Sequence, residues 1–342
     1  MTSRGLPRET VVFFGAGAGV ADGLPSTDAI AEKVATFLAA RGVDRAFLLP
    51  ASLDVLIAEP TGKNLMRLLA DVWDLAYKTP DLAIHLYHFI TIATQSAADL
   101  PKTGIQGFRK RLLEAALRRG NRLSILTTNW DTSLDSIVDL ISGPEATYID
   151  FGMELDGRPK AEDDETTIRF YKLNGSADWF FCHTCSIMQT ARGIRMQRGL
   201  PENWKSSDFA VLCRGCKQLM ERVIVVPTEG QARNPMAPRA DKAQASPIPL
   251  FRHAGSALEN AGEVLFVGYS LPDYDVAIRS LLQCALPKNE RILRGERIIS
   301  VIAKENRDGV TCRNFRKAFP DGQFLFHGNG LEYFVQSYEA QV

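Results

Sequence analysis

Four of the six cysteines form two C-x-x-C pairs, Cys182 with Cys185 and Cys213 with Cys216. Each pair can make a short turn that presents two thiolates to one ion, and tetrahedral zinc takes sulfur ligands at about 2.3 Å. Because sulfur fills all four positions, no position is left for a water or a substrate. The pattern therefore predicts a closed, structural zinc site, with His183 inside the first pair as a bystander.

A glycine-rich loop, "GAGAG" over residues 15–19, follows the apolar run "VVFF" and precedes a predicted helix. Glycines let backbone N–H groups approach a pyrophosphate at a helix N-terminus, so the loop is a candidate phosphate-binding site. It is not the dehydrogenase fingerprint G-x-G-x-x-G, because Val20 stands where the third glycine would be. A plain turn between strand and helix remains the alternative.

Polar residues also follow three other predicted strands. Asn129 and Asp131 lie in "TTNWD" after "RLSIL", "GYSLPDYD" follows "EVLFV", and Asn174 follows "TIRFYKL". At the carboxyl ends of parallel strands such side chains face the ligand crevice. Simpler interpretations stay open, namely helix caps in the first two segments and a tight Asn-Gly turn in the third, since both residues tolerate left-handed backbone angles.

Strand patterns alternate with helix patterns along most of the chain, which predicts an α/β fold with a doubly wound parallel sheet. Further strands are predicted over "ATYID", "RVIVVP", "RIISVIA" and "QFLFHG", and residues 233–249 are predicted to be a loop. We expect one α/β domain from residues 1–42, 120–174 and 223–342. A helical insert over 43–119 and a zinc-ribbon part over 175–222 would interrupt it.

The composition excludes several classes of protein. Hydrophobic residues make up 45% and charged residues 23% of 342 residues, which is ordinary for a globular chain. Forty basic residues balance forty acidic ones, so the basic footprint of a nucleic-acid-binding protein is missing. The apolar runs are too short or too charged to span a bilayer, and no signal peptide is recognised. We expect a cytoplasmic protein with reduced or metal-bound cysteines.

Taken in order, these motifs resemble the Sir2 family of sirtuin-type NAD-binding proteins. The motifs are "GAG" with "GLP" (23–25), the helical insert, "TTNWD", "KLNGS", the two cysteine pairs, "IVVP", "GYSL" and "VIAKEN". They cover nearly the whole chain, and the insert, "TTNWD" and "GYSLPDYD" are most similar to bacterial Sir2-like proteins of antiphage defence. The resemblance implies a Rossmann-like domain, a smaller helical and zinc-binding part, and NAD in the cleft between them.

The resemblance also implies a role for individual residues. Glycine-loop residues would face the NAD phosphates, Asn129 and Asp131 the nicotinamide and its ribose, and later positions the adenosine half. The implied cofactor-binding residues are Gly15, Ala16, Gly17, Pro25, Thr128, Asn129, Asp131, Gly268, Ser270, Lys304, Gly328 and Asn329. The implied catalytic residues are Asn129, Asp131 and Asn174.

Two departures from the family pattern bear on activity. The catalytic histidine of the family's "HGS" motif is replaced by Asn174, and the aromatic residue and arginine after "GLP" are replaced by "STD" (26–28). Cleavage of the nicotinamide–ribose bond passes through an oxocarbenium-like transition state and releases a neutral base, so it does not need the missing imidazole as an acid.

The sequence therefore favours an NAD+ hydrolase, with three other hypotheses left open. One is a catalytically weak or inactive sensor that binds NAD or ADP-ribose. The others are an NAD-dependent protein deacylase and an ADP-ribosyl transferase. The expected partners are NAD or ADP-ribose, with a homo-oligomer or a partner ATPase or nuclease as further possibilities.

Overall fold

The structure is a computed structural model. It describes residues 9–24, 26–40, 51–76, 107–119, 122–130, 132–142, 149–153, 155, 168–190, 211–218, 220–224, 248–319 and 323–341. Two predicted site residues, Pro25 and Asp131, lie outside these ranges, as does nearly all of the predicted loop over 233–249.

Seven parallel strands form the main sheet, in the order β10-β9-β8-β1-β2-β4-β3. The strands are β1 (Glu9–Phe14), β2 (Arg122–Thr127), β3 (Ile149–Asp150), β4 (Ile168–Lys172), β8 (Ala261–Val267), β9 (Ile299–Ile302) and β10 (Phe324–His327). All six residues of the central strand β1 are buried, as expected for a strand covered on both faces. The predicted doubly wound α/β fold is confirmed.

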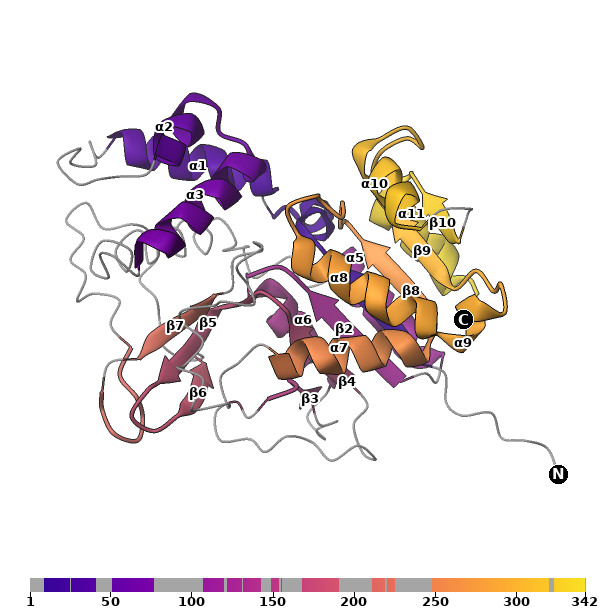
Figure 1. The fold of residues 1–342 in the computed structure, drawn as a ribbon. Coiled ribbons are helices and arrows are strands. Elements are labelled where there is room, and N and C mark those ends of the chain that lie inside the picture. The colour runs from indigo at the N-terminus through magenta and orange to yellow at the C-terminus, as the bar shows by residue number, and fades with distance from the viewer. Residues whose placement is uncertain are drawn as a thin grey trace.

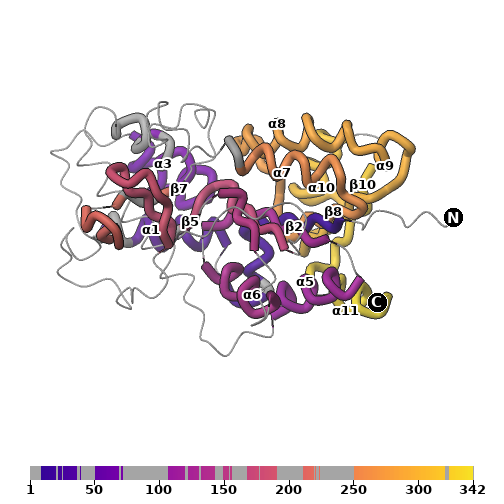
Figure 2. The backbone as a smooth tube through the Cα atoms, turned by 90° about the horizontal axis from the view of Figure 1, so that it is seen from below, coloured from indigo at the N-terminus to yellow at the C-terminus, as the bar shows by residue number. Residues whose placement is uncertain are grey.

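Helices cover both faces of this sheet, which Figure 2 shows edge-on. On one face lie α7 (Ile248–Asn260) and α8 (Val276–Ala285), and on the other lie α5 (Phe108–Arg118), α6 (Ser133–Ser142) and α11 (Gly330–Glu339). The short helix α9 (Glu290–Leu293) and helix α10 (Val310–Ala318) complete the C-terminal part. Phe13, Phe266 and Phe315 pack in sequence through the core, with ring centroids 5.4 and 5.0 Å apart.

Three helices of the N-terminal region form a separate group, drawn in indigo in Figure 1. They are α1 (Thr27–Ala40), α2 (Ala51–Ala58) and α3 (Gly62–Ala76). The Ser26 hydroxyl accepts a hydrogen bond from the Ala29 N–H at 3.2 Å and so caps the start of the first helix. The Asp28 carboxylate accepts one from the Gly62 N–H at 2.6 Å and joins α1 to the start of α3.

A second sheet has three antiparallel strands in the order β6-β5-β7, namely β6 (Ile187–Thr190), β5 (Gly175–Cys182) and β7 (Glu221–Ile224). The strand predicted over "RVIVVP" thus pairs with β5 and not with the parallel sheet, because Gly175 pairs with Ile224. The expected boundary at residue 223 falls inside this strand. The Asn-Gly turn connects the end of β4 directly to β5, and Gly175 has a φ of 74°.

Among the described helices, none combines the length and apolar character that crossing a membrane requires.

Candidate functional site

A cavity of about 490 Å³ opens at the carboxyl ends of the parallel strands. Its wall includes residues that follow β9, β8, β1, β2 and β4, which are five adjacent strands of the sheet. Helices α1 and α3 close it from the other side with apolar side chains such as Ile30, Leu65 and Met66. Of the residues predicted from the sequence, the cavity brings together Ala16, Gly17, Thr128, Asn129, Asn174, Gly268, Ser270 and Lys304.

The glycine loop after β1 packs tightly against the loop after β8. The N–H groups of Gly15 and Gly17 donate to the carbonyls of Val267 and Gly268, at 3.0 and 2.9 Å. A Cβ on Gly15 would come within 2.6 Å of the Tyr269 Cα, and one on Gly268 within 2.0 Å of the Ala18 nitrogen. These glycines therefore permit contact between two loops. Gly15 is buried under the cavity, and its N–H and that of Gly17 are already bonded to protein, contrary to the expectation that they meet phosphates.

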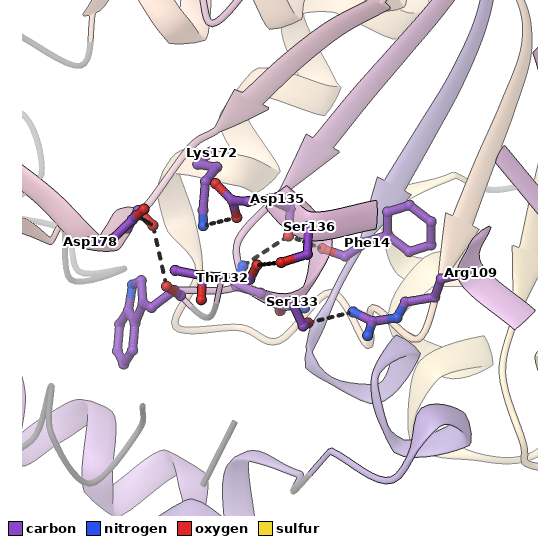
Figure 3. Close-up of polar contacts among 12 residues, drawn as sticks. Phe14, Arg109, Thr132, Ser133, Asp135, Ser136, Lys172 and Asp178 are labelled. Carbon is purple, nitrogen blue, oxygen red and sulfur yellow. Dashed lines mark hydrogen bonds and ion pairs between the residues drawn. The ribbon is translucent and has the colours of Figure 1, made fainter. Parts of the chain in front are cut away.

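A buried ion pair connects the segment after the glycine loop to helix α5. Asp22, in the short helix η2 (Val20–Asp22) that follows η1 (Ala16–Ala18), pairs with Arg109 of α5 at 2.5 Å, and both side chains are at most 3% exposed. The same carboxylate accepts a hydrogen bond from the Phe108 N–H at 3.1 Å, at the start of α5. Arg109 also donates to the Ser133 hydroxyl at 3.1 Å, as Figure 3 shows. No sequence pattern pointed to this contact, because the pair is 87 residues apart.

Asn129 is held in one orientation at the end of β2. Its side-chain Nδ2 donates to the Gly15 carbonyl at 3.1 Å, and its N–H donates to the Thr127 hydroxyl at 3.0 Å. The carboxamide oxygen is therefore the end of the side chain that can accept a hydrogen bond from a ligand or a water. The alternative that Asn129 serves only as a helix cap does not account for its bond to the glycine loop.

Asn174 lies in the same cavity wall and is 3% exposed. Its Nδ2 donates to the Thr128 carbonyl in a long hydrogen bond of 3.4 Å. An amide cannot accept a proton at neutral pH, so this position supplies no general base. Among the described residues, no histidine lines the cavity: His183 packs on Phe181, His253 on Tyr171 and His327 on Phe334.

The loop after β8 contains a carboxyl group that the sequence did not single out. Asp275 is 3% exposed and lines the cavity, and its Oδ2 accepts a 2.6 Å hydrogen bond from the Tyr269 hydroxyl. Burial raises the pKa of the Asp275 carboxyl to about 6, although Tyr269, the nearby Ile278 N–H and Arg279 lower it. The Ile278 N–H does not reach hydrogen-bond geometry, and Oδ1 has no partner among the described residues.

Of the residues Lys304, Gly328 and Asn329, predicted to bind the adenosine half of NAD, only Lys304 lines the cavity. Lys304, exposed after β9, lines the cavity and forms an isolated antiparallel bridge with Asn329. Gly328 and Asn329 do not line the cavity. A Cβ on Gly328 would come within 2.4 Å of the Glu305 carbonyl, so this glycine permits the close approach of two loops.

The four cysteines of the predicted metal site converge in the small sheet. Their sulfur atoms all lie within 4.8 Å of one another, with Cys182 and Cys216 3.4 Å apart and Cys185 and Cys213 3.9 Å apart. Zinc–sulfur bonds of 2.3 Å in a tetrahedron place sulfurs about 3.8 Å apart. The cluster fits a structural zinc ion.

The two cysteine turns have the same backbone form. The residue after each pair, Ser186 or Lys217, has a positive φ of 55° or 62°. The N–H of each donates to the carbonyl of the first cysteine of its pair, at 2.7 and 3.0 Å. This repeated turn directs both sulfurs of a pair to the same side, as a shared metal ion requires.

No family model and no curated protein matches the sequence. Solved structures of Sir2 proteins are similar over 98% of the chain. One described as the structural basis for sirtuin substrate affinity is 15% identical, with 93% of that chain covered and a TM-score of 0.46. Sir2Tm bound to a propionylated peptide is 14% identical, with 93% covered and a TM-score of 0.47. A Sir2 homologue in complex with ADP-ribose is 13% identical, with 91% covered and a TM-score of 0.46. Similarity at these values assigns neither a family nor an activity to this chain.

Proposed function

We propose that this protein binds NAD across the ends of its parallel strands and hydrolyses the nicotinamide–ribose bond. The observation that carries the proposal is the order of the strands around the cavity. The glycine loop follows β1, with β8 and β9 on one side of it and β2 and β4 on the other. Strands lie about 4.8 Å apart, so the five ends span about 19 Å. A pyrophosphate beside the central loop, where Ala16 and Gly17 line the cavity, with one nucleoside on each side fits this arrangement.

The two asparagines favour the β2 and β4 side for the nicotinamide ribose. The anchored carboxamide of Asn129 would orient a water or a ribose hydroxyl, and Asn174 would supply a second hydrogen bond. In the reaction the bond from ribose to nicotinamide breaks, water oxygen bonds to the ribose carbon, and the proton is released to solvent. Nicotinamide leaves neutral and no group protonates it. Preorganised amide dipoles stabilise the oxocarbenium-like transition state.

A second function, binding without turnover, is favoured by one observation. Asn174 cannot act as a base, and the described part of the cavity wall contains no histidine. Loss of a general base costs about 10²–10⁴-fold in rate. An NAD or ADP-ribose sensor would keep the same contacts and lack measurable cleavage. The antiphage-defence setting rests on the sequence resemblance alone, the cytoplasmic location rests on the signal-peptide and cysteine arguments, and both are part of this proposal.

The test is to incubate purified protein with NAD and measure free nicotinamide by chromatography. We expect slow release, a loss of at least tenfold in Asn129→Ala, and faster release in Asn174→His. Asn260→Ala, at the exposed end of α7, is the control and should match wild type. An inert wild type that binds ADP-ribose and gains activity with Asn174→His would establish the sensor. Unchanged activity in Asn129→Ala would refute the site.

A further inference from the structure

Two chain segments that carry the site asparagines are joined side by side, and we call residues 127–130, 132–135 and 172–178 the seam. The Leu173 N–H donates to the Thr127 carbonyl at 2.8 Å, beside the contact from Asn174 to Thr128. Farther along, the Ser176 hydroxyl lies 3.5 Å from the Trp130 carbonyl. The seam therefore has contacts on both sides of Asn129 and of Asn174.

The strongest contact of the seam is an ion pair in the protein interior. The Lys172 ammonium lies 2.7 Å from the Asp135 carboxylate, and the two side chains are 0% and 5% exposed. Lys172 is the last residue of β4, two positions before Asn174, and Asp135 lies in the first turn of α6, which begins four positions after Asn129. Figure 3 shows the two side chains directed at one another, with Asp178 on the neighbouring strand.

A second buried carboxylate lies on the β5 side of the seam. Asp178 is 6% exposed and accepts a 2.5 Å hydrogen bond from Ser176, two residues after Asn174. A hydroxyl has one proton, so Ser176 directs it to the closer carboxylate and approaches Trp130 only weakly. The ion pair joins the end of β4 to the first turn of α6.

Buried ion pairs add little stability of their own. Removing two charges from water costs about as much as their attraction returns, and an apolar replacement of similar size is often as stable. The Lys172–Asp135 pair has a role other than stability if Asn129 and Asn174 must both bind one ribose in a fixed geometry. The spacing of polar groups around a reacting centre is the property that tolerates least error.

We propose that the Lys172–Asp135 pair is a positioning pair, which sets the spacing of Asn129 and Asn174 around the terminal ribose of the ligand. The inference rests on the proposed function, because it needs a ligand whose ribose reaches the β2 and β4 side. ADP lacks that ribose and ADP-ribose has it. The pair therefore acts on the affinity for ADP-ribose and leaves the affinity for ADP as it is.

The test compares two charge-removing double variants of the full-length protein. The first is Lys172→Met with Asp135→Asn. The second, Arg169→Met with Glu9→Gln, removes the matched pair at the other end of β4, where Arg169 and Glu9 lie 3.0 Å apart. Calorimetric titration with ADP and with ADP-ribose gives the affinities. Thermal unfolding and zinc content show whether each variant is folded. If the first variant does not fold, Lys172→Arg replaces it, because this change keeps the positive charge but shifts its position.

We expect the first variant to lose about tenfold or more in affinity for ADP-ribose, the equivalent of one misplaced hydrogen bond. Its affinity for ADP should stay within about twofold, as should both affinities of the second variant. Equal weakening for ADP and ADP-ribose would overturn the inference, since a merely structural role acts on both. Unchanged ADP-ribose affinity would overturn it as well. Wild-type protein that binds neither ligand would refute the proposed function itself, and the inference with it.

Discussion

Asp275 provides the most direct test of the electrostatics of the cavity wall. The perturbation is Asp275→Asn, which keeps the shape of the side chain and an acceptor for the Tyr269 hydroxyl but has no charge. In the wild type, burial raises the pKa of this carboxyl from 3.8 to about 6. The folded protein therefore holds the proton more tightly than the unfolded chain does, and the ionised carboxylate is a cost to stability above pH 6.

The magnitude follows from the size of this rise. At 1.36 kcal/mol for each pH unit, the cost is about 3 kcal/mol at pH 7.5. Removing it should raise the free energy of unfolding by about this amount. For a chain of this length that corresponds to about 4 °C in the unfolding midpoint. As the pH falls from about 6 to about 4 the wild-type carboxyl becomes protonated, so the advantage of the variant should shrink and disappear.

The assay is denaturant unfolding of unliganded wild type and variant between pH 4 and 8. Asp273→Asn is the matched control in the same loop, because the Asp273 side chain is 76% exposed, and its effect should stay within about 0.5 kcal/mol. Asp275 makes no side-chain capping hydrogen bond to α8, so loss of a cap does not confuse the result. A variant that is less stable at pH 7.5, or a gain that does not vary with pH, would refute the reasoning.

Two further predictions concern stability. Wild-type protein should contain one equivalent of zinc by metal analysis, and Cys213→Ser should lose it and unfold the small sheet, because metal-binding energy there is folding energy; carefully prepared protein without zinc would contradict this. Arg109→Met should lower the free energy of unfolding by about 3–5 kcal/mol, since it leaves Asp22 buried and unpaired. Arg111→Met, in the same helix with its partner Glu339 at the surface, should cost at most about 1 kcal/mol. Equal effects of the two arginine variants in denaturant unfolding would show that burial of the first pair does not matter.

The sequence alone was sufficient for the features that depend on local pattern. Alternating strand and helix periods predicted the doubly wound sheet, and the glycines, polar strand ends and cysteine spacing predicted which segments meet at the cavity and at the metal cluster. Such features involve residues within a few positions of each other, or a topology that parallel strands impose.

Tertiary structure decided the rest, because it depends on contacts between distant segments. "RVIVVP" has the composition of a core strand, yet its register with Gly175 places it in the small sheet. The glycines of residues 15–17 looked like a phosphate cradle, whereas two of their N–H groups bond to the loop after β8. The buried pairs Asp22–Arg109 and Lys172–Asp135 have no sequence signature. The partner of a charged residue cannot be identified from the sequence, because only the folded chain brings the two side chains together and buries them.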